Sequence, residues 1–152
     1  MKNIKTILLS SIFAFNLSCN QQVKKEIKGK LAFESISFLS LYGSSDNQYK
    51  EFLIEMENGK SSDNNKKDLY TYFSKLKKHN ILRNPYIFLE VEKDSIITVY
   101  LNEDNYEKVK NYNYSDLYFN KEKVLLKLLL EEKEKNIYYS DSILSVEKIK
   151  YE

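Results

Sequence analysis

The residue types that most often carry catalysis are scarce in this chain. His79 is the single histidine and Cys19 the single thiol. Carboxylates are abundant, and Glu90 and Glu92 lie two residues apart in a segment of alternating apolar residues. That spacing would place both on one face of a strand, where a pair of carboxylates can act as general acid and general base. With 22 acidic residues in the chain, chance pairs are expected, so we predict no catalytic residue and prefer a solvated face.

The usual ligand-binding motifs are absent. One histidine and one cysteine cannot complete a zinc site. The acids lack the spacing of a calcium-binding loop, and the segment from Glu57 to Ser61 lacks the first glycine of a phosphate loop because Ile54 occupies that position. We therefore expect no metal and no cofactor.

Tyrosine is abundant, with 13 residues in the chain. Tyrosine offers a large, rigid contact area with a polar tip, which suits binding surfaces. Core packing and codon bias are the plainer explanation. The weaker hypothesis is a binding face made by the tyrosines in and near residues 111–120, together with two tyrosines of the last predicted strand. Residues 111–120 fit neither helical nor alternating periodicity, which predicts a surface connection. The candidates are Tyr106, Tyr112, Tyr114, Tyr118, Tyr138 and Tyr139.

The first residues have the pattern of an export signal. Lys2 and Lys5 precede an apolar stretch over residues 6–17, which is too short to span a bilayer as a helix, and Ser18 and Cys19 follow. This arrangement resembles the signal peptides of bacterial lipoproteins, although Asn16 and Leu17 depart from the usual lipobox. The resemblance implies a signal peptide over residues 1–18 and acylation of Cys19, which would anchor the chain in a lipid bilayer. It also explains a lone cysteine in an exported protein.

The residue after the cysteine bears on location. Asn20 stands where an Asp favours inner-membrane retention in some bacteria, and no acidic run follows Cys19. The resemblance therefore implies the bacterial cell envelope, at the periplasmic face of the outer membrane. We predict a lipidated cysteine and tether over residues 19–29 and one domain over residues 30–152.

The mature chain is electrically balanced. Lys2 and Lys5 are removed with the signal peptide, so the mature chain has 24 − 2 = 22 basic and 22 acidic residues. Arg83 is the only arginine, which leaves little for bidentate phosphate recognition. The balance predicts no nucleic-acid partner.

Two helices are predicted in the first half of the domain. Residues 46–57 have Ser45 and Gln48 as a capping box, and residues 64–79 have Asp63 as cap. Their apolar stripes follow helical spacing: Tyr49, Phe52, Leu53 and Met56 in the first, and Leu69, Tyr72, Phe73 and Leu76 in the second. Residues 30–42 fit either a strand or a helix.

Alternation with a period of two follows. Residues 86–92 and 95–101 predict a hairpin, residues 104–112 a short helix that buries Tyr106 and Val109, and residues 137–148 a last strand. The leucine-rich residues 121–132 have good helix propensity, but their strict alternation from Val124 to Leu130 favours a strand. The sequence thus predicts an α+β fold, with two N-terminal helices and an antiparallel sheet in β-β-α-β-β order. The alternative is an OB-like five-stranded barrel, in which residues 30–42 form the first strand and the two helices are an insertion.

These features predict a membrane-anchored envelope lipoprotein that is not an enzyme and binds another macromolecule, such as an immunity-type lipoprotein that neutralises a toxin at the membrane. A protein of the envelope would be its partner. The alternative is a carboxylate-dependent envelope hydrolase that uses Glu90 and Glu92.

Overall fold

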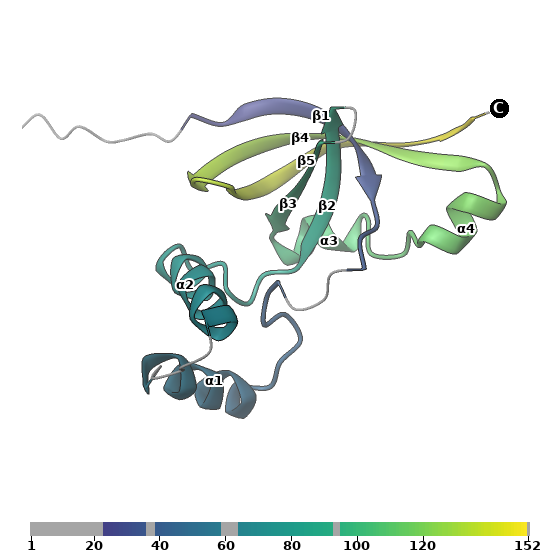
Figure 1. The fold of residues 1–152 in the computed structure, drawn as a ribbon. Helices are drawn as coiled ribbons and strands as arrows, with labels where there is room; N and C mark the ends of the chain where they lie inside the picture. The colour runs from purple at the N-terminus through teal and green to yellow at the C-terminus, as the bar shows by residue number, and fades with distance from the viewer. Residues whose placement is uncertain (1–22, 36–38, 59–63, 93–94, 152) are drawn as a thin grey trace, which may run out of the picture.

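A computed structural model describes residues 23–35, 39–58, 64–92 and 95–151. The predicted signal peptide, Cys19, the predicted cap Asp63 and the two residues that join the strands of the predicted hairpin lie outside these residues. The elements, in chain order, are β1 (Lys25–Ala32), α1 (Asp46–Asn58), α2 (Asn64–Lys78), β2 (Tyr86–Glu92), β3 (Ser95–Leu101), α3 (Glu103–Glu107), α4 (Tyr114–Phe119), β4 (Glu122–Glu134) and β5 (Ile137–Lys150) (Figure 1). The α+β class is confirmed.

The five strands pair in a closed ring, in the order β1-β2-β3-β5-β4. The predicted sheet was purely antiparallel, but β3 and β5 run parallel where Val99–Leu101 meets Tyr138–Ser140. The order β-β-α-β-β holds from β2 onwards, with β1 added before it and a second short helix before β4. The OB-like alternative matches this arrangement in three respects. The barrel has five strands, helices lie between β3 and β4, and two helices are inserted between β1 and β2.

The first strand begins earlier than predicted. Residues 25–29, assigned to the tether, belong to β1, because Lys25 to Lys30 pair with β4. Ile27, Gly29 and Leu31 alternate toward the core between exposed or half-buried lysines. A Cβ at Gly29 would lie 2.6 Å from Cγ of Leu89 and 2.8 Å from the carbonyl oxygen of Glu90. Glycine is therefore required where β1 passes close to β2.

One core fills the barrel. The strand prediction for residues 121–132 is confirmed, since Val124, Leu126 and Leu128 of β4 are fully buried. They pack with Leu89, Val99 and Leu101 of β2 and β3. Burial of these alternating side chains, rather than intrinsic helix propensity, decides the structure of this leucine-rich segment.

A second core lies between α1, α2 and the barrel. Phe73 and Leu76 of α2 are fully buried, and the predicted stripe of α1 packs against them. The capping box is confirmed, because the Gln48 side chain accepts from the Ser45 backbone N–H at 2.9 Å. The hydroxyl of buried Tyr100 donates to the carbonyl of Leu39 at 2.6 Å, which fixes the chain before α1 to β3.

The segment between β3 and β4 differs from the prediction. The helix predicted for residues 104–112 is the shorter α3, and its N-cap is Asn102, whose side chain accepts from the Asn105 backbone N–H. Residues 114–119, predicted to be a connection, form α4 with Asn113 as its N-cap. Only Leu117 of α4 is buried, so a helix of this length leaves no apolar period for sequence analysis to detect.

Candidate functional site

The six candidate tyrosines do not form one surface. Tyr106, Tyr112 and Tyr138 are half-buried against the barrel core, and Tyr139 packs on the core beneath the helices. Tyr114 and Tyr118, in contrast, are 60% and 58% exposed. Only these two of the six remain as members of an exposed surface.

Two phenylalanines extend this surface. The ring centroids of Phe33, just after β1, and Tyr114 lie 6.3 Å apart, and those of Tyr114 and Tyr118 lie 5.7 Å apart in a stacked arrangement. Phe119 follows at 5.8 Å from Tyr118 and is 81% exposed. We call Phe33, Tyr114, Tyr118 and Phe119 the aromatic patch. Surface aromatics gathered in this way are typical of interaction sites.

The aromatic patch borders an open cleft of about 690 Å³ between the end of β1 and the start of β4. Leu31 and Leu117, both members of the barrel core, lie at its base. Ile96 of β3 and Tyr151, both exposed, line it as well. We call this space the β1–β4 cleft. Sequence analysis missed Phe33, Ile96 and Tyr151, because only the folded barrel brings them near α4.

The charges that line the cleft are mostly neutralised by ion pairs. Glu90 forms an ion pair with Lys30 across the β1–β2 pairing. Glu122 pairs with Lys148 at 3.0 Å. Paired carboxylates next to apolar rings suit a neutral or apolar ligand and give little attraction to a polyanion.

The two carboxylates of the hydrolase alternative do not act as a unit. Glu90 is engaged by Lys30, whereas Glu92 is exposed near the end of β2, beyond a register shift between the two residues. Within the described residues, no group of three histidine, cysteine or acidic side chains is placed to hold a metal ion.

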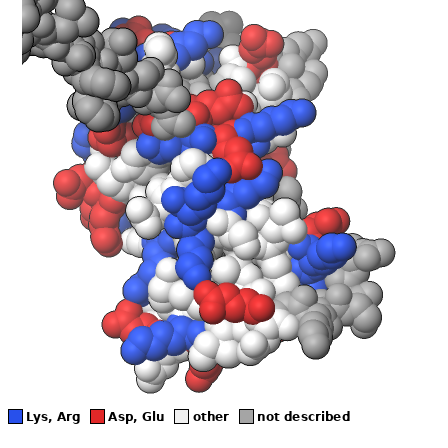
Figure 2. Space-filling view, turned by 90° about the vertical axis from the view of Figure 1, so that its left-hand side faces the viewer, with Lys and Arg blue, Asp and Glu red and all other residues white. Residues whose placement is uncertain are grey.

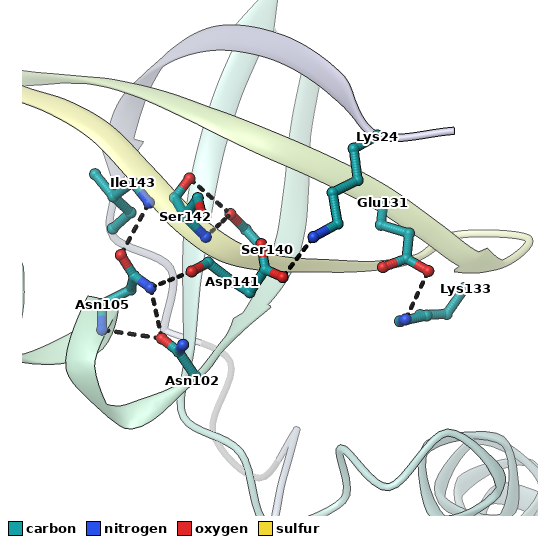
Figure 3. Close-up of polar contacts among 9 residues, drawn as sticks. All are labelled: Lys24, Asn102, Asn105, Glu131, Lys133, Ser140, Asp141, Ser142 and Ile143. Atoms are coloured by element: carbon teal, nitrogen blue, oxygen red, sulfur yellow. Dashed lines mark hydrogen bonds and ion pairs between the residues drawn. The ribbon is translucent and has the colours of Figure 1, made fainter. Parts of the chain in front are cut away.

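A buried amide joins α3 to β5. Asn105 donates from Nδ2 to the carbonyl of Asp141 at 2.7 Å and accepts at Oδ1 from the backbone N–H of Ile143 at 2.9 Å (Figure 3). The pairing of β3 with β5 ends at Leu101 and Ser140. The Asn105 side chain supplies hydrogen bonds to the β5 backbone beyond that point, where β3 no longer does. Asn105 is therefore a structural residue that holds α3 against the barrel.

The start of β1 is tied to β5 nearby. The Lys24 ammonium contacts Oδ2 of Asp141 at 2.5 Å, and this contact lowers the pKa of the Asp141 carboxyl (Figure 3). Glu131 and Lys133 form a second ion pair at 2.6 Å on β4. Around the β4–β5 turn and α2, lysines and acids are interspersed, without a field of one sign (Figure 2).

His79 lies at the C-terminal end of α2, as the sequence suggested. Its Nε2 is 3.5 Å from Oε2 of Glu134 near the β4–β5 turn, and Lys75 lies 3.1 Å from the same carboxylate. The Lys75 hydrogen bond most of all lowers the pKa of Glu134, and the charge of Lys78 and the hydrogen bond from His79 act in the same direction. The cluster connects the helices to the barrel rather than forming a catalytic centre.

Among the described helices, none combines the length and the hydropathy needed to cross a bilayer. No protein-family model, curated protein or solved structure matches the chain.

Proposed function

We propose that this chain is a lipid-anchored protein of the bacterial cell envelope that binds another protein without catalysis. The single observation that carries the binding proposal is the aromatic patch. Phe33, just after β1, and three rings of α4 contact one another in a row at the surface, although aromatic rings of this size usually contribute to a core. Tyrosine rings held in place provide binding area at low entropic cost.

The position of the patch supports the proposed anchor. The start of β1 and α4 lie on opposite sides of the molecule (Figure 1). From Cys19 to Lys24 the chain spans at most about 18 Å, and Lys24 is held to Asp141 of β5. An acylated Cys19 would therefore keep the start of β1 near the bilayer and leave the aromatic patch facing away from the membrane, toward a partner in the periplasm.

The anchor is tested by the intact mass of the protein purified from membranes. We expect a chain that begins at Cys19 and carries acyl mass, and loss of the membrane fraction in Cys19→Ser. A mature chain that begins at another residue, or that lacks acyl mass, would contradict the anchor.

Binding is tested by affinity purification from chemically crosslinked envelopes. We expect a discrete partner with the wild-type protein, a strong loss with Tyr114→Ala combined with Tyr118→Ala, and no loss with Ile54→Ala. Ile54 is a matched control because it is exposed on α1 and does not line the cleft. The hydrolase alternative would replace this proposal if no partner is retained and the purified protein cleaves cell-wall material in a reaction that Glu90→Gln abolishes.

A further inference from the structure

The β1–β4 cleft is bordered by two strand edges without a partner. The pairing of β1 with β4 ends at Lys30 and Leu125. Beyond this point Leu31 and Ala32 pair with β2 alone, and Glu122 to Val124 pair with β5 alone. Among the described strands, none is hydrogen-bonded to these facing edges at the end of β1 and the start of β4.

Such edges present backbone N–H and C=O groups that can pair with an added strand. The aromatic patch lies directly beside them, because Phe33 follows the last residue of β1 and α4 leads into β4. Side chains of an added strand that point to one face would meet the base of the cleft at Leu31 and Leu117 and the rings of Tyr114 and Tyr118.

We propose that the β1–β4 cleft binds an extended segment of a partner protein, which adds as a strand along the free edge of β1 and places apolar or aromatic side chains on the aromatic patch. This inference rests on the proposed function and specifies how the partner is bound. The segment carries no strong net charge where it enters the cleft, because Lys30 with Glu90 and Glu122 with Lys148 neutralise one another. Glu34 and Lys123, which also line the cleft, are of opposite sign.

The same features disfavour other ligands. A nucleic acid would require a basic field, whereas the cleft is lined by two lysines and three acids, with Lys30 paired to Glu90. A neutral glycan can stack on tyrosines, but it has no alternating amide groups to pair with a strand edge. The open edges thus favour a peptide over a glycan.

The inference is tested with the mature chain and a phage library of random linear peptides, with chitin-derived oligosaccharides as the glycan arm. We expect selection of peptides with alternating apolar or aromatic residues, and no binding of the oligosaccharides. Tyr118→Ala should weaken a selected peptide by about tenfold or more, whereas Ile54→Ala should leave its affinity unchanged.

Strand addition also predicts a backbone signature. A strand forms hydrogen bonds with one neighbour through alternate residues. N-methylation of every second amide of the peptide should therefore abolish binding, while N-methylation of the intervening amides should leave the affinity unchanged. Bound peptide should slow hydrogen exchange at amides of residues 31–35. The inference would be overturned if no linear peptide is selected, if both methylation patterns have the same effect on binding, or if the protein binds only the oligosaccharides.

The two proposals can fail separately. If the envelope partner is lost with Tyr114→Ala and Tyr118→Ala but gives no protection at residues 31–35, the protein binds through a folded surface and only the strand addition is wrong. If no envelope partner is retained, the proposed function itself fails.

Discussion

The ring of Tyr114 stacks on that of Tyr118, with 5.7 Å between centroids and 22° between planes. The two residues lie four positions apart on α4 and therefore share one face of this short helix. Their mutual contact fixes the orientation of two rings that are more than half exposed. The surface is organised before any partner arrives, which lowers the entropy lost on binding.

The first prediction separates binding from stability at this pair. Tyr114→Ala and Tyr118→Ala should each change the free energy of unfolding by about 0.5 kcal/mol or less, because exposed side chains contribute little to the core. Each should weaken partner binding by about 1–3 kcal/mol. Denaturant unfolding and titration calorimetry measure the two effects. Phe73→Ala is the buried control and should lower stability by about 3–5 kcal/mol; a comparable loss in Tyr114→Ala would show that its ring belongs to the core.

The second prediction concerns Tyr100, whose hydroxyl contacts Tyr72 at 2.5 Å and donates to the carbonyl of Leu39. Burial raises the pKa of Tyr100, so it remains a neutral donor. Tyr100→Phe leaves the Leu39 carbonyl and the Tyr72 hydroxyl without their partner and should lower the free energy of unfolding by about 1–3 kcal/mol. Tyr72→Phe retains the bond to Leu39 and should have a smaller effect. Equal losses in chemical denaturation would contradict this hydrogen-bond arrangement.

The third prediction concerns Asn105. Asn105→Ala removes the partners of the Asp141 carbonyl and of the Ile143 N–H, and should lower stability by about 2–3 kcal/mol. Hydrogen exchange should accelerate at the Ile143 amide ahead of the rest of β5. If the Ile143 amide exchanges at the same rate in wild type and variant, α3 does not hold β5 through this residue.

The fourth prediction is a pH dependence at the junction of α2 and the barrel. The pKa of Glu134 is lowered from its ordinary value of 4.5, first by the Lys75 hydrogen bond. A lowered carboxyl pKa in the folded state adds stability above the pKa of the unfolded chain, and this contribution is lost as the pH falls below about 4.5. Glu134→Gln should therefore lose less stability than wild type between pH 6 and pH 3, and Lys75→Gln should act in the same direction. Parallel pH profiles of melting temperature for wild type and Glu134→Gln would contradict the assignment.

The fifth prediction tests the close crossing of β1 and β2. Gly29→Ala places a methyl group against the Leu89 side chain and the Glu90 carbonyl, and should lower stability by about 1–3 kcal/mol through overpacking. Ala32→Gly, in the same strand, should be milder because it removes a half-buried methyl group without creating a clash. A neutral Gly29→Ala would show that the two strands are farther apart than the structure indicates.

Sequence analysis succeeded where a local pattern decided the structure. The alternation of Ile87 and Leu89 predicted β2, and the capping box of Ser45 with Gln48 predicted the start of α1. It failed for the start of β1, because lysines flank Ile27 and a glycine occupies the next inward position.

The candidate site was only partly predictable. The exposure of Tyr114 and Tyr118 followed from their place in a segment that matches no buried periodicity, but Tyr138 and Tyr139 were placed on the same surface only by their residue type. Phe33 joins Tyr114 through closure of the barrel between β1 and β4, and no local pattern encodes a contact between segments so distant in sequence.

The most direct test of the account is a photoreactive amino acid placed at position 118 in living cells, with position 54 as the matched control. The account predicts one discrete protein adduct from position 118, absent from position 54 and lost when Phe33→Ala and Tyr114→Ala are added. An absence of adduct at position 118, or the same adducts at both positions, would contradict the claim that the aromatic patch is the binding surface of this protein.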